Sequence, residues 1–502
     1  MRKHGPFICF LVLWLGGNLL FLERFPFVHS DEPWLAGLTR AMLESGSLNG
    51  TEPFFDLKPR FPHAIKSLFH LLQMPFLQIF GYGAFSFRLL SLLGGAGCLI
   101  LFHALALRLA GSGAIALLAS VLLGVDIQFI YASHFARQEI LVLLAMLACF
   151  LLLARPSGKP RAVAAAVITG LCIGVHPNAF ILAAMCGALF LVIRSGWRPV
   201  AAYAGITGLF AAAFVGISLA FDPDFFRHYF AFGSEFLIDS SLPAKIRETG
   251  PYFQRLYYRV SGTYYTPDIR PQLVLFLFVT ALSAIAAIRS GRRFALPLAA
   301  LFGIWAGMAL VGRFSQPYVI FFFPFCYLLL TALLQGLGKT LAPLCLCACI
   351  GLAGWLCAAQ VWPVATQPFQ YEGYLANIAA AVPPGAKTIG NLNAGYHFAN
   401  GALRDYRNLP YLKKNGLSFA DYARDNAVEY VIVSDELRFL YERRPVWNGI
   451  YGTINFLPEM EEYLRTCALV RTFTDNQYGV RVTRFQNGGR DFAVRIYHCP
   501  RP

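Results

Sequence analysis

The chain has 502 residues, of which 57% are hydrophobic and 14% are charged, and its formal net charge is +15 at pH 7. Soluble proteins carry about 25% charged residues, so this composition excludes an ordinary soluble protein. The basic residues lie in short clusters between apolar runs and form no stripe interleaved with aromatic residues, which argues against nucleic acid as a partner.

Apolar runs fill residues 1–362, whereas residues 363–502 have the mixed composition of a soluble domain. Segment 1–22 begins with basic residues, and no small-residue cleavage site follows it, so we expect a retained first span. Crossing a membrane takes about 20 apolar residues in a helix. The fold class predicted is a polytopic α-helical membrane protein with a C-terminal α/β domain. The predicted spans are eleven in all: 7–22, 87–107, 114–132, 139–154, 162–176, 178–193, 200–220, 272–288, 294–312, 317–335 and 341–361.

Basic residues orient these spans. With the N-terminus inside, the inner segments are 1–6, 108–113, 155–161, 194–199, 289–293 and 336–340, and they hold twelve Lys and Arg residues and no Asp or Glu. Cytoplasmic loops are enriched in Lys and Arg. We therefore expect a cytoplasmic N-terminus, an exported C-terminal domain and, from the short inner loops, a bacterial inner membrane. The twelve are Arg2, Lys3, Arg108, Arg155, Lys159, Arg161, Arg194, Arg198, Arg289, Arg292, Arg293 and Lys339.

The first outer loop begins with Ser30-Asp31-Glu32-Pro33, which is typical of a helix start capped by the serine. The helix is expected to lie along the membrane surface, as is a second one that carries His63, Lys66, His70 and Gln73 on one face. Two interpretations of Asp31 and Glu32 stay open. Both acids serve the helix start, or one of them is the general base for an acceptor hydroxyl or amine.

Lys58 and Arg60 lie in a short, proline-containing loop between these two helices. Arginine binds phosphate with a planar fork and lysine binds it as a point charge. The loop therefore predicts a site for a lipid-anchored phosphate. The alternative is that both side chains only reach for membrane lipid headgroups.

Several motifs then follow in a fixed order on the same predicted side of the membrane. After the acidic pair and Lys58-Pro59 come Phe80-Gly81-Tyr82-Gly83, Arg88-Leu89-Leu90-Ser91, Ala136-Arg137-Gln138-Glu139 and Gly174-Val175-His176-Pro177. In this order the chain resembles polyprenyl-phosphate-dependent glycosyltransferases of the GT-C fold, the superfamily of the protein O-mannosyltransferases and the aminoarabinose–lipid A transferase. The resemblance covers roughly residues 5–335.

The resemblance implies roles for particular residues. Asp31, with Glu32 beside it, corresponds to the catalytic base or acceptor-binding acid, and Glu139 to a second acid that places the acceptor. Lys58 corresponds to the lysine of a Lys-Pro-Pro pattern that contacts the carrier phosphate. The chain departs from that pattern at Arg60, which stands in place of the second proline.

Three further donor-phosphate contacts are expected from the same resemblance, namely Arg88, His176 and Arg313. The implied reaction is an inverting displacement that moves a sugar from a polyprenyl-phosphate carrier to a lipid, glycan or protein acceptor. The chain shows no His/Cys ligand spacing, so no cofactor is expected to be required, although some relatives use a divalent metal.

The remaining outer segments are less specific. Loop 222–270 is rich in tyrosine, including Tyr264, and is expected to be an interfacial belt or a lid over the site. The C-terminal domain is predicted to have helices at 371–381 and 418–425 and strands near 387–390, 429–434, 467–473, 479–485 and 491–497, with no catalytic constellation of its own. In an oxidising compartment Cys467 and Cys499 either pair or stay as two thiols.

Two other functions compete with the transferase. A transporter or flippase predicts polar groups at mid-membrane, broken helices and internal repeats, whereas the spans here carry few ionisable residues. A non-enzymatic receptor leaves the outer grouping of Asp31, Lys58, Glu139 and His176 without an explanation.

Overall fold

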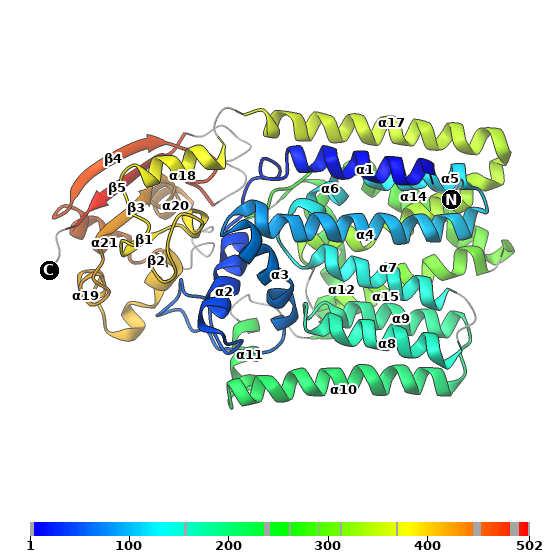
Figure 1. Cartoon of the computed structure of the whole chain (residues 1–502), viewed down its shortest axis with the longest axis horizontal. Coiled ribbons are helices and arrows are strands. Elements are labelled where there is room, and N and C mark those ends of the chain that lie inside the picture. Colours follow the sequence, from blue (N-terminus) through cyan, green and yellow to red (C-terminus); the bar gives the residue numbers. More distant parts are fainter. Residues whose placement is uncertain are drawn as a thin grey trace.

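A computed structural model describes residues 5–154, 158–234, 241–260, 263–290, 292–311, 314–367, 370–444, 453–481 and 491–499. A bundle of long helices forms one part, and a smaller sheet domain lies at one end of it (Figure 1). The bundle consists of α1 (Gly5–Leu20), α4 (Ala84–Ala110), α5 (Gly113–Gly124), α6 (Ile127–His134), α7 (Glu139–Leu153), α8 (Lys159–Ile173), α9 (Ala179–Val192), α10 (Trp197–Phe221), α14 (Arg270–Ser290), α15 (Arg292–Val311), α16 (Phe323–Leu334) and α17 (Gly338–Ala365).

Each predicted span coincides with one of these helices, with the bent pair α5–α6, or with α16 and the short 3₁₀-helix before it, Gln316–Phe321. By length and hydropathy, five helical stretches of the described chain are able to cross a membrane, or six if the bent pair counts as one. The protein is therefore helical with several apolar spans, and the number eleven stays a prediction.

Close helix packing inside the bundle depends on small residues. A side chain at Gly303 of α15 would lie 2.5 Å from the Cα of Met185 on α9, and one at Gly307 would lie 2.7 Å from the Cα of Ile181. Helices in membranes gain their contacts from such close backbone approach, since lipid offers no hydrophobic drive between them. This pair of helices therefore packs backbone to backbone.

The predicted single span 114–132 is broken, because α5 and α6 meet at an angle of 64°. Asp126 lies at the break and its Oδ1 accepts a hydrogen bond from the backbone N–H of Phe129, which caps α6. Its Oδ2 accepts a 2.7 Å hydrogen bond from Tyr327 of α16. The carboxylate is buried, so this predicted span holds an ionisable group at its break.

The two predicted surface helices are present as α2 (Asp31–Ser45) and α3 (Ser67–Phe80). They are tied together by Thr39 of α2, which donates to Gln73 at 2.6 Å and contacts the ring of His70 at 2.8 Å. Ser30 makes no side-chain cap, so its predicted capping role is wrong. The ring of His29 instead accepts the first backbone N–H of α2, that of Asp31, and Glu32 reaches back to accept the backbone N–H of His29.

The C-terminal domain contains a sheet of the order β2-β1-β3-β5-β4. Strands β1 (Thr388–Gly390), β2 (Leu403–Asp405) and β3 (Tyr430–Ser434) are parallel, while β4 (Ala468–Thr474) and β5 (Ala493–His498) are antiparallel to their neighbours. Helices α18 (Tyr371–Ala379), α19 (Phe419–Asp425), α20 (Asp435–Arg443) and α21 (Leu457–Leu464) accompany it. The predicted strand 479–485 extends into residues outside the described ones.

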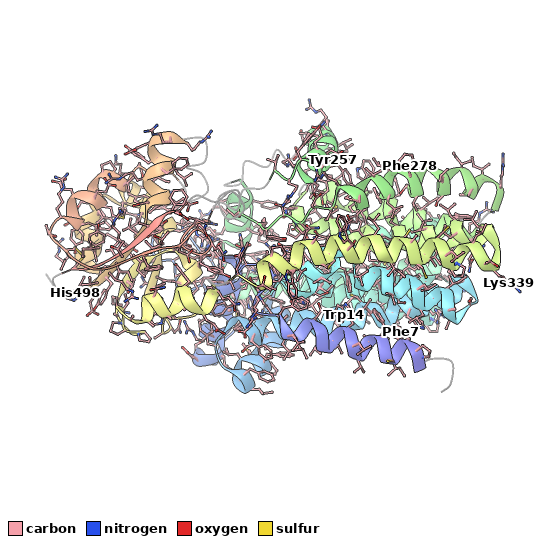
Figure 2. The ribbon with its side chains drawn as sticks, turned by 90° about the horizontal axis from the view of Figure 1, so that it is seen from above. Phe7, Trp14, Tyr257, Phe278, Lys339 and His498 are labelled. Atoms are coloured by element: carbon pink, nitrogen blue, oxygen red, sulfur yellow. A yellow bond between two sulfur atoms is a disulfide. The ribbon has the colours of Figure 1, made fainter. Side chains whose placement is uncertain are left out.

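The predicted inner segment 336–340 lies at the end of the bundle away from the sheet domain (Figure 2). Figure 2 shows Lys339 at the end of the bundle that also carries Phe7, and His498 of the sheet at the opposite end. Arg108, after α4, donates to the carbonyl of Leu151 near the end of α7, so these two basic-flanked helix ends also lie together. The orientation of the bundle in a membrane stays a prediction.

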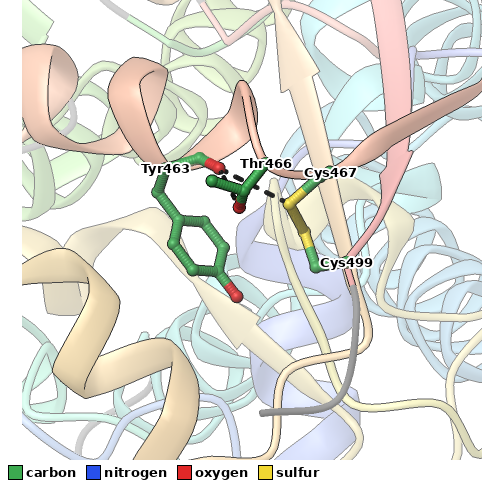
Figure 3. Close-up of a disulfide and its surroundings, with 4 residues drawn as sticks. All are labelled: Tyr463, Thr466, Cys467 and Cys499. Atoms are coloured by element: carbon green, nitrogen blue, oxygen red, sulfur yellow. Dashed lines mark hydrogen bonds between the residues drawn. A yellow bond between two sulfur atoms is a disulfide. The ribbon is translucent and has the colours of Figure 1, made fainter.

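A disulfide joins Cys467, at the start of β4, to Cys499, after β5 (Figure 3). It closes a loop with a sequence separation of 32 and cross-links the two antiparallel strands. Of the two interpretations of these cysteines, the structure has the paired one.

Peptide mapping tests this bond. Digestion of the purified chain without reduction is expected to yield one linked species that contains Cys467 and Cys499, and reduction should separate it into two peptides. Recovery of both peptides unlinked from freshly purified protein would contradict the disulfide.

Candidate active site

A fully buried ion pair holds the start of α2. Arg88 of α4 donates to Glu32 twice, from Nε to Oε2 at 2.7 Å and from Nη2 to Oε1 at 2.8 Å, and both side chains are 0% exposed. Its Nη1 donates to the carbonyl of Leu22, and Glu32 also accepts the backbone N–H of Ala136. The pair thus joins three segments that are far apart in the sequence.

Asp31 points to a different set of partners. Its Oδ2 accepts a 2.7 Å hydrogen bond from Arg137 and a 2.9 Å hydrogen bond from the hydroxyl of Tyr264. The Asp31 side chain is 19% exposed, in contrast to Glu32. Of the two acids, Asp31 is therefore the one that a substrate is able to reach.

Arg137 connects the two acids that the resemblance singles out. Its Nη1 contacts Asp31, and its Nη2 lies 2.9 Å from Oε1 of Glu139, the first residue of α7. Two carboxylates therefore contact one guanidinium. Asp31 and Glu139, 108 positions apart in the chain, belong to one site.

Electrostatics keep Asp31 ionised. Burial acts to raise its pKa, but the neighbouring groups outweigh burial and lower the pKa well below the ordinary value; they are His29, Arg137, Arg481 and Tyr264. Burial lowers the pKa of His29 to about 3, so its ring is neutral at pH 7 and accepts the backbone N–H of Asp31. The arginines therefore supply the positive charge that holds this carboxylate.

The predicted phosphate-binding cations lie against two aromatic rings. Arg60 is 4.6 Å from the ring centre of Trp34 and 5.0 Å from that of Phe55. The ammonium of Lys58 is 6.0 and 5.9 Å from the same two rings. Arg60 also faces Glu52 at 3.9 Å. Lys58 and Arg60 are thus grouped around these two rings, on the loop that follows α2.

The C-terminal domain fixes the shape of this loop through Asn408. The Oδ1 of Asn408 accepts three backbone N–H groups, from Asp56 at 3.1 Å, Leu57 at 3.3 Å and Lys58 at 3.2 Å. Its Nδ2 donates to the carbonyl of Phe54 at 2.9 Å. The side-chain amide of Asn408 therefore fixes the backbone conformation of the segment that carries Lys58.

The remaining predicted phosphate contacts are His176, Arg313 and Arg88. His176 is buried at the turn between α8 and α9, where its Nδ1 accepts the backbone N–H of Asn178. Arg313 lies outside the described residues. Arg88 is committed to Glu32 and Leu22, as given above.

Sequence reasoning missed Arg137, Tyr264 and His29. Arg137 stood within a quoted motif but received no role, and Tyr264 was counted with the interfacial tyrosines. Its hydroxyl in fact donates to Asp31, and its ring stacks on His29 with 4.5 Å between ring centres. The spacing of Arg137 two residues before Glu139 was the available signal.

A cavity of about 350 Å³ lies between the first outer loop and α17, and none of the three acids is among its lining residues. It is lined by Phe27, which lies two residues before His29, and by Tyr265, which follows Tyr264, and its other wall is α17. Within the described ranges, no three His, Cys, Asp or Glu side chains are grouped as a metal site would require.

The structure shares its fold with a solved protein. It resembles the crystal structure of ArnT from Cupriavidus metallidurans bound to undecaprenyl phosphate, with a TM-score of 0.52 and 13% identity over 98% of each chain. The apo state of the same protein matches with a TM-score of 0.49 and 15% identity over 97% of this chain and 98% of that one.

Arabinosyltransferase EmbB from Mycobacterium smegmatis matches with a TM-score of 0.43 and 13% identity, over 74% of this chain and 42% of that one. The fold assignment rests on the first ArnT structure. No protein-family model and no curated protein sequence matches the chain.

The buried ion pair makes a prediction about stability. Glu32→Gln leaves Arg88 as an unpaired buried charge, which costs about 3–5 kcal/mol. The exposed pair of Asp224 and Arg227 provides the control, because Asp224→Asn there costs about 0–1 kcal/mol. In detergent-purified protein, the thermal unfolding midpoint should fall markedly for Glu32→Gln and little for Asp224→Asn. Equal midpoints for the two variants would show that the pair contributes no such stability.

The loop geometry makes a second prediction. Asn408→Ala removes four hydrogen bonds of about 1 kcal/mol each, so amide hydrogen exchange in residues 54–60 should accelerate at least about tenfold. Asn415→Ala, which loses one exposed hydrogen bond to Tyr411, should leave that segment unchanged. Slow exchange in Asn408→Ala would mean that the loop keeps its shape without the C-terminal domain.

Proposed function

We propose that this protein is a membrane glycosyltransferase that moves a sugar from a polyprenyl-phosphate carrier to an acceptor on the outer face of the cytoplasmic membrane. The observation that carries the proposal is the convergence of Asp31 and Glu139 on Arg137, on the side of the bundle where Lys58 and Arg60 follow the same α2 helix. The fold of ArnT, seen bound to undecaprenyl phosphate in its own structure, supports the choice of carrier.

The reaction needs no nucleophile from the protein. The acceptor hydroxyl or amine attacks the anomeric carbon opposite the phosphate, and the new bond forms while the carbon–oxygen bond to the phosphate breaks, so the configuration inverts. The acceptor proton passes to Asp31. The phosphate leaves on its lipid with one additional negative charge, which Lys58 and Arg60 stabilise.

The low pKa of Asp31 defines its role more closely. A carboxylate that stays ionised at neutral pH is always able to accept a hydrogen bond from the acceptor, although it is a weak equilibrium base. Asp31 therefore orients the acceptor and receives its proton late in the reaction. Arg137 and Tyr264 hold it in place for this, and Glu139 acts on the acceptor from the other side of Arg137.

Glu32 and Arg88 receive a different role from the one the resemblance implied. Their mutual hydrogen bonds and complete burial leave no surface for a substrate. We assign them as positioning residues that hold Asp31. His176 remains a proposed phosphate contact, and a divalent metal is no part of the proposed mechanism.

A broken span is also a feature of transporters. The break at Asp126 has a local cause, because that carboxylate caps α6 and accepts from Tyr327. Since both oxygens are engaged in holding helices together, the break favours a structural role over a transport path. The transferase is therefore preferred to a flippase or a receptor.

Complementation tests the proposal. In a strain that lacks the gene, mass spectrometry of surface lipids and glycans should show one species lighter by a sugar residue, and the wild-type chain should restore it. Asp31→Asn and Glu139→Gln, present at equal levels in the membrane, should fail to restore it or restore less than about one hundredth. The remote variant Asp224→Asn should restore it fully. Restoration by Asp31→Asn would overturn the assignment of this residue.

A further inference from the structure

The C-terminal domain places a third cation beside Lys58 and Arg60. Arg407 is in the short 3₁₀-helix Tyr406–Tyr411, which begins directly after β2. Its guanidinium lies 4.5 Å from the ring centre of Trp34 and 5.1 Å from that of Phe55. These are the same two rings that Lys58 and Arg60 approach. Three cations from two domains therefore surround one aromatic pair.

Arg407 is held rigidly and is only partly satisfied. Asp405 accepts both the Nε and the backbone N–H of Arg407, at 2.6 and 3.0 Å, and the two side chains are 5% and 3% exposed. The Nη2 of Arg407 is buried and has no hydrogen-bond partner among the residues that the structure describes. A buried donor of this kind costs free energy unless a ligand accepts from it.

The local charge balance favours an anion. Among the described residues, Glu52 faces Arg60 and accepts the indole N–H of Trp34 at 2.7 Å, and Asp405 holds Arg407. The three cations outnumber these two carboxylates. Burial and, to a smaller extent, the charge of Arg407 lower the pKa of His29, which stands two residues before Asp31 in the chain.

We propose that Arg407 completes the phosphate site, so that the carrier phosphate binds between the first outer loop of the bundle and the C-terminal domain. This inference rests on the proposed function and deepens it. The planar fork of Arg407 donates to a phosphate oxygen through Nη2, while Lys58 and Arg60 approach the same phosphate from the loop. The C-terminal domain is then part of the active site instead of a cover.

Binding measurements test this directly. The full chain is placed in phosphatidylcholine nanodiscs and titrated with undecaprenyl phosphate. Arg407→Gln should raise the Kd at least about tenfold, because a hydrogen bond to a charged group is lost. Arg495→Gln removes an equal charge from β5, where Arg495 pairs with Asp435, and should leave the Kd unchanged. Unchanged binding by Arg407→Gln would overturn the inference.

Titrations with other phosphate-containing ligands show which phosphate source the site takes. Binding by the wild-type chain separates a failure of the proposed function from a failure of this inference. If phosphatidylglycerol binds as tightly as undecaprenyl phosphate and loses the same affinity in Arg407→Gln, the site takes any anionic lipid and the inference fails. Inorganic phosphate should compete weakly. If the wild-type chain does not bind undecaprenyl phosphate, the proposed function itself fails, whereas normal wild-type binding with normal Arg407→Gln binding rejects this inference alone.

Amide hydrogen exchange of the wild-type chain tests the same inference without a substitution, so the result does not depend on whether Arg407→Gln folds. Undecaprenyl phosphate should slow amide exchange in residues 403–411 as well as in residues 54–60, because the phosphate bridges both segments. Protection of residues 54–60 without protection of residues 403–411 would contradict a role for Arg407.

Discussion

The buried pair of Glu32 and Arg88 is the constraint on which the site depends. A buried charge without its partner would destabilise the fold. The two hydrogen bonds from Arg88 to Glu32 therefore hold the start of α2 against α4. The same carboxylate accepts from Ala136, immediately before Arg137. The side chain of Glu32 therefore positions both Asp31, which precedes it, and Arg137, which follows Ala136.

A second constraint joins the two domains. Gly395 of the C-terminal domain packs so closely on the first turn of α2 that a side chain there would lie 2.9 Å from Pro33. Arg404 donates to the carbonyl of Pro53, and Asn408 binds the following backbone. The sheet domain therefore rests on the loop that carries the proposed phosphate-binding cations, and the proposed function gives this domain a part in shaping that loop.

The sequence predicted the fold well where the physical signal is local. Apolar runs located the bundle helices, and alternating patterns located β1, β3, β4 and β5 within a few residues. It did not show the break at Asp126, because a single polar residue in an apolar run looks the same in a straight helix. It also missed β2, whose three residues are too short for a pattern.

The candidate site was predictable in part for the same reason. Asp31, Lys58 and Glu139 stand in recognisable motifs, whereas the choice between Asp31 and Glu32 depends on which one faces Arg88. Arg407 follows a strand in a remote domain, and nothing in its neighbourhood of the sequence relates it to Trp34. Contacts between segments about 370 residues apart (407 minus 34) are set by tertiary packing, which local patterns do not encode.

The most direct measurement of the central claim is a structure of this chain in a lipid nanodisc with undecaprenyl phosphate. The account predicts phosphate density within hydrogen-bond distance of Lys58, Arg60 or Arg407, on the side of the bundle where Asp31 contacts Arg137. Phosphate bound at the opposite end, near Lys339, would contradict it.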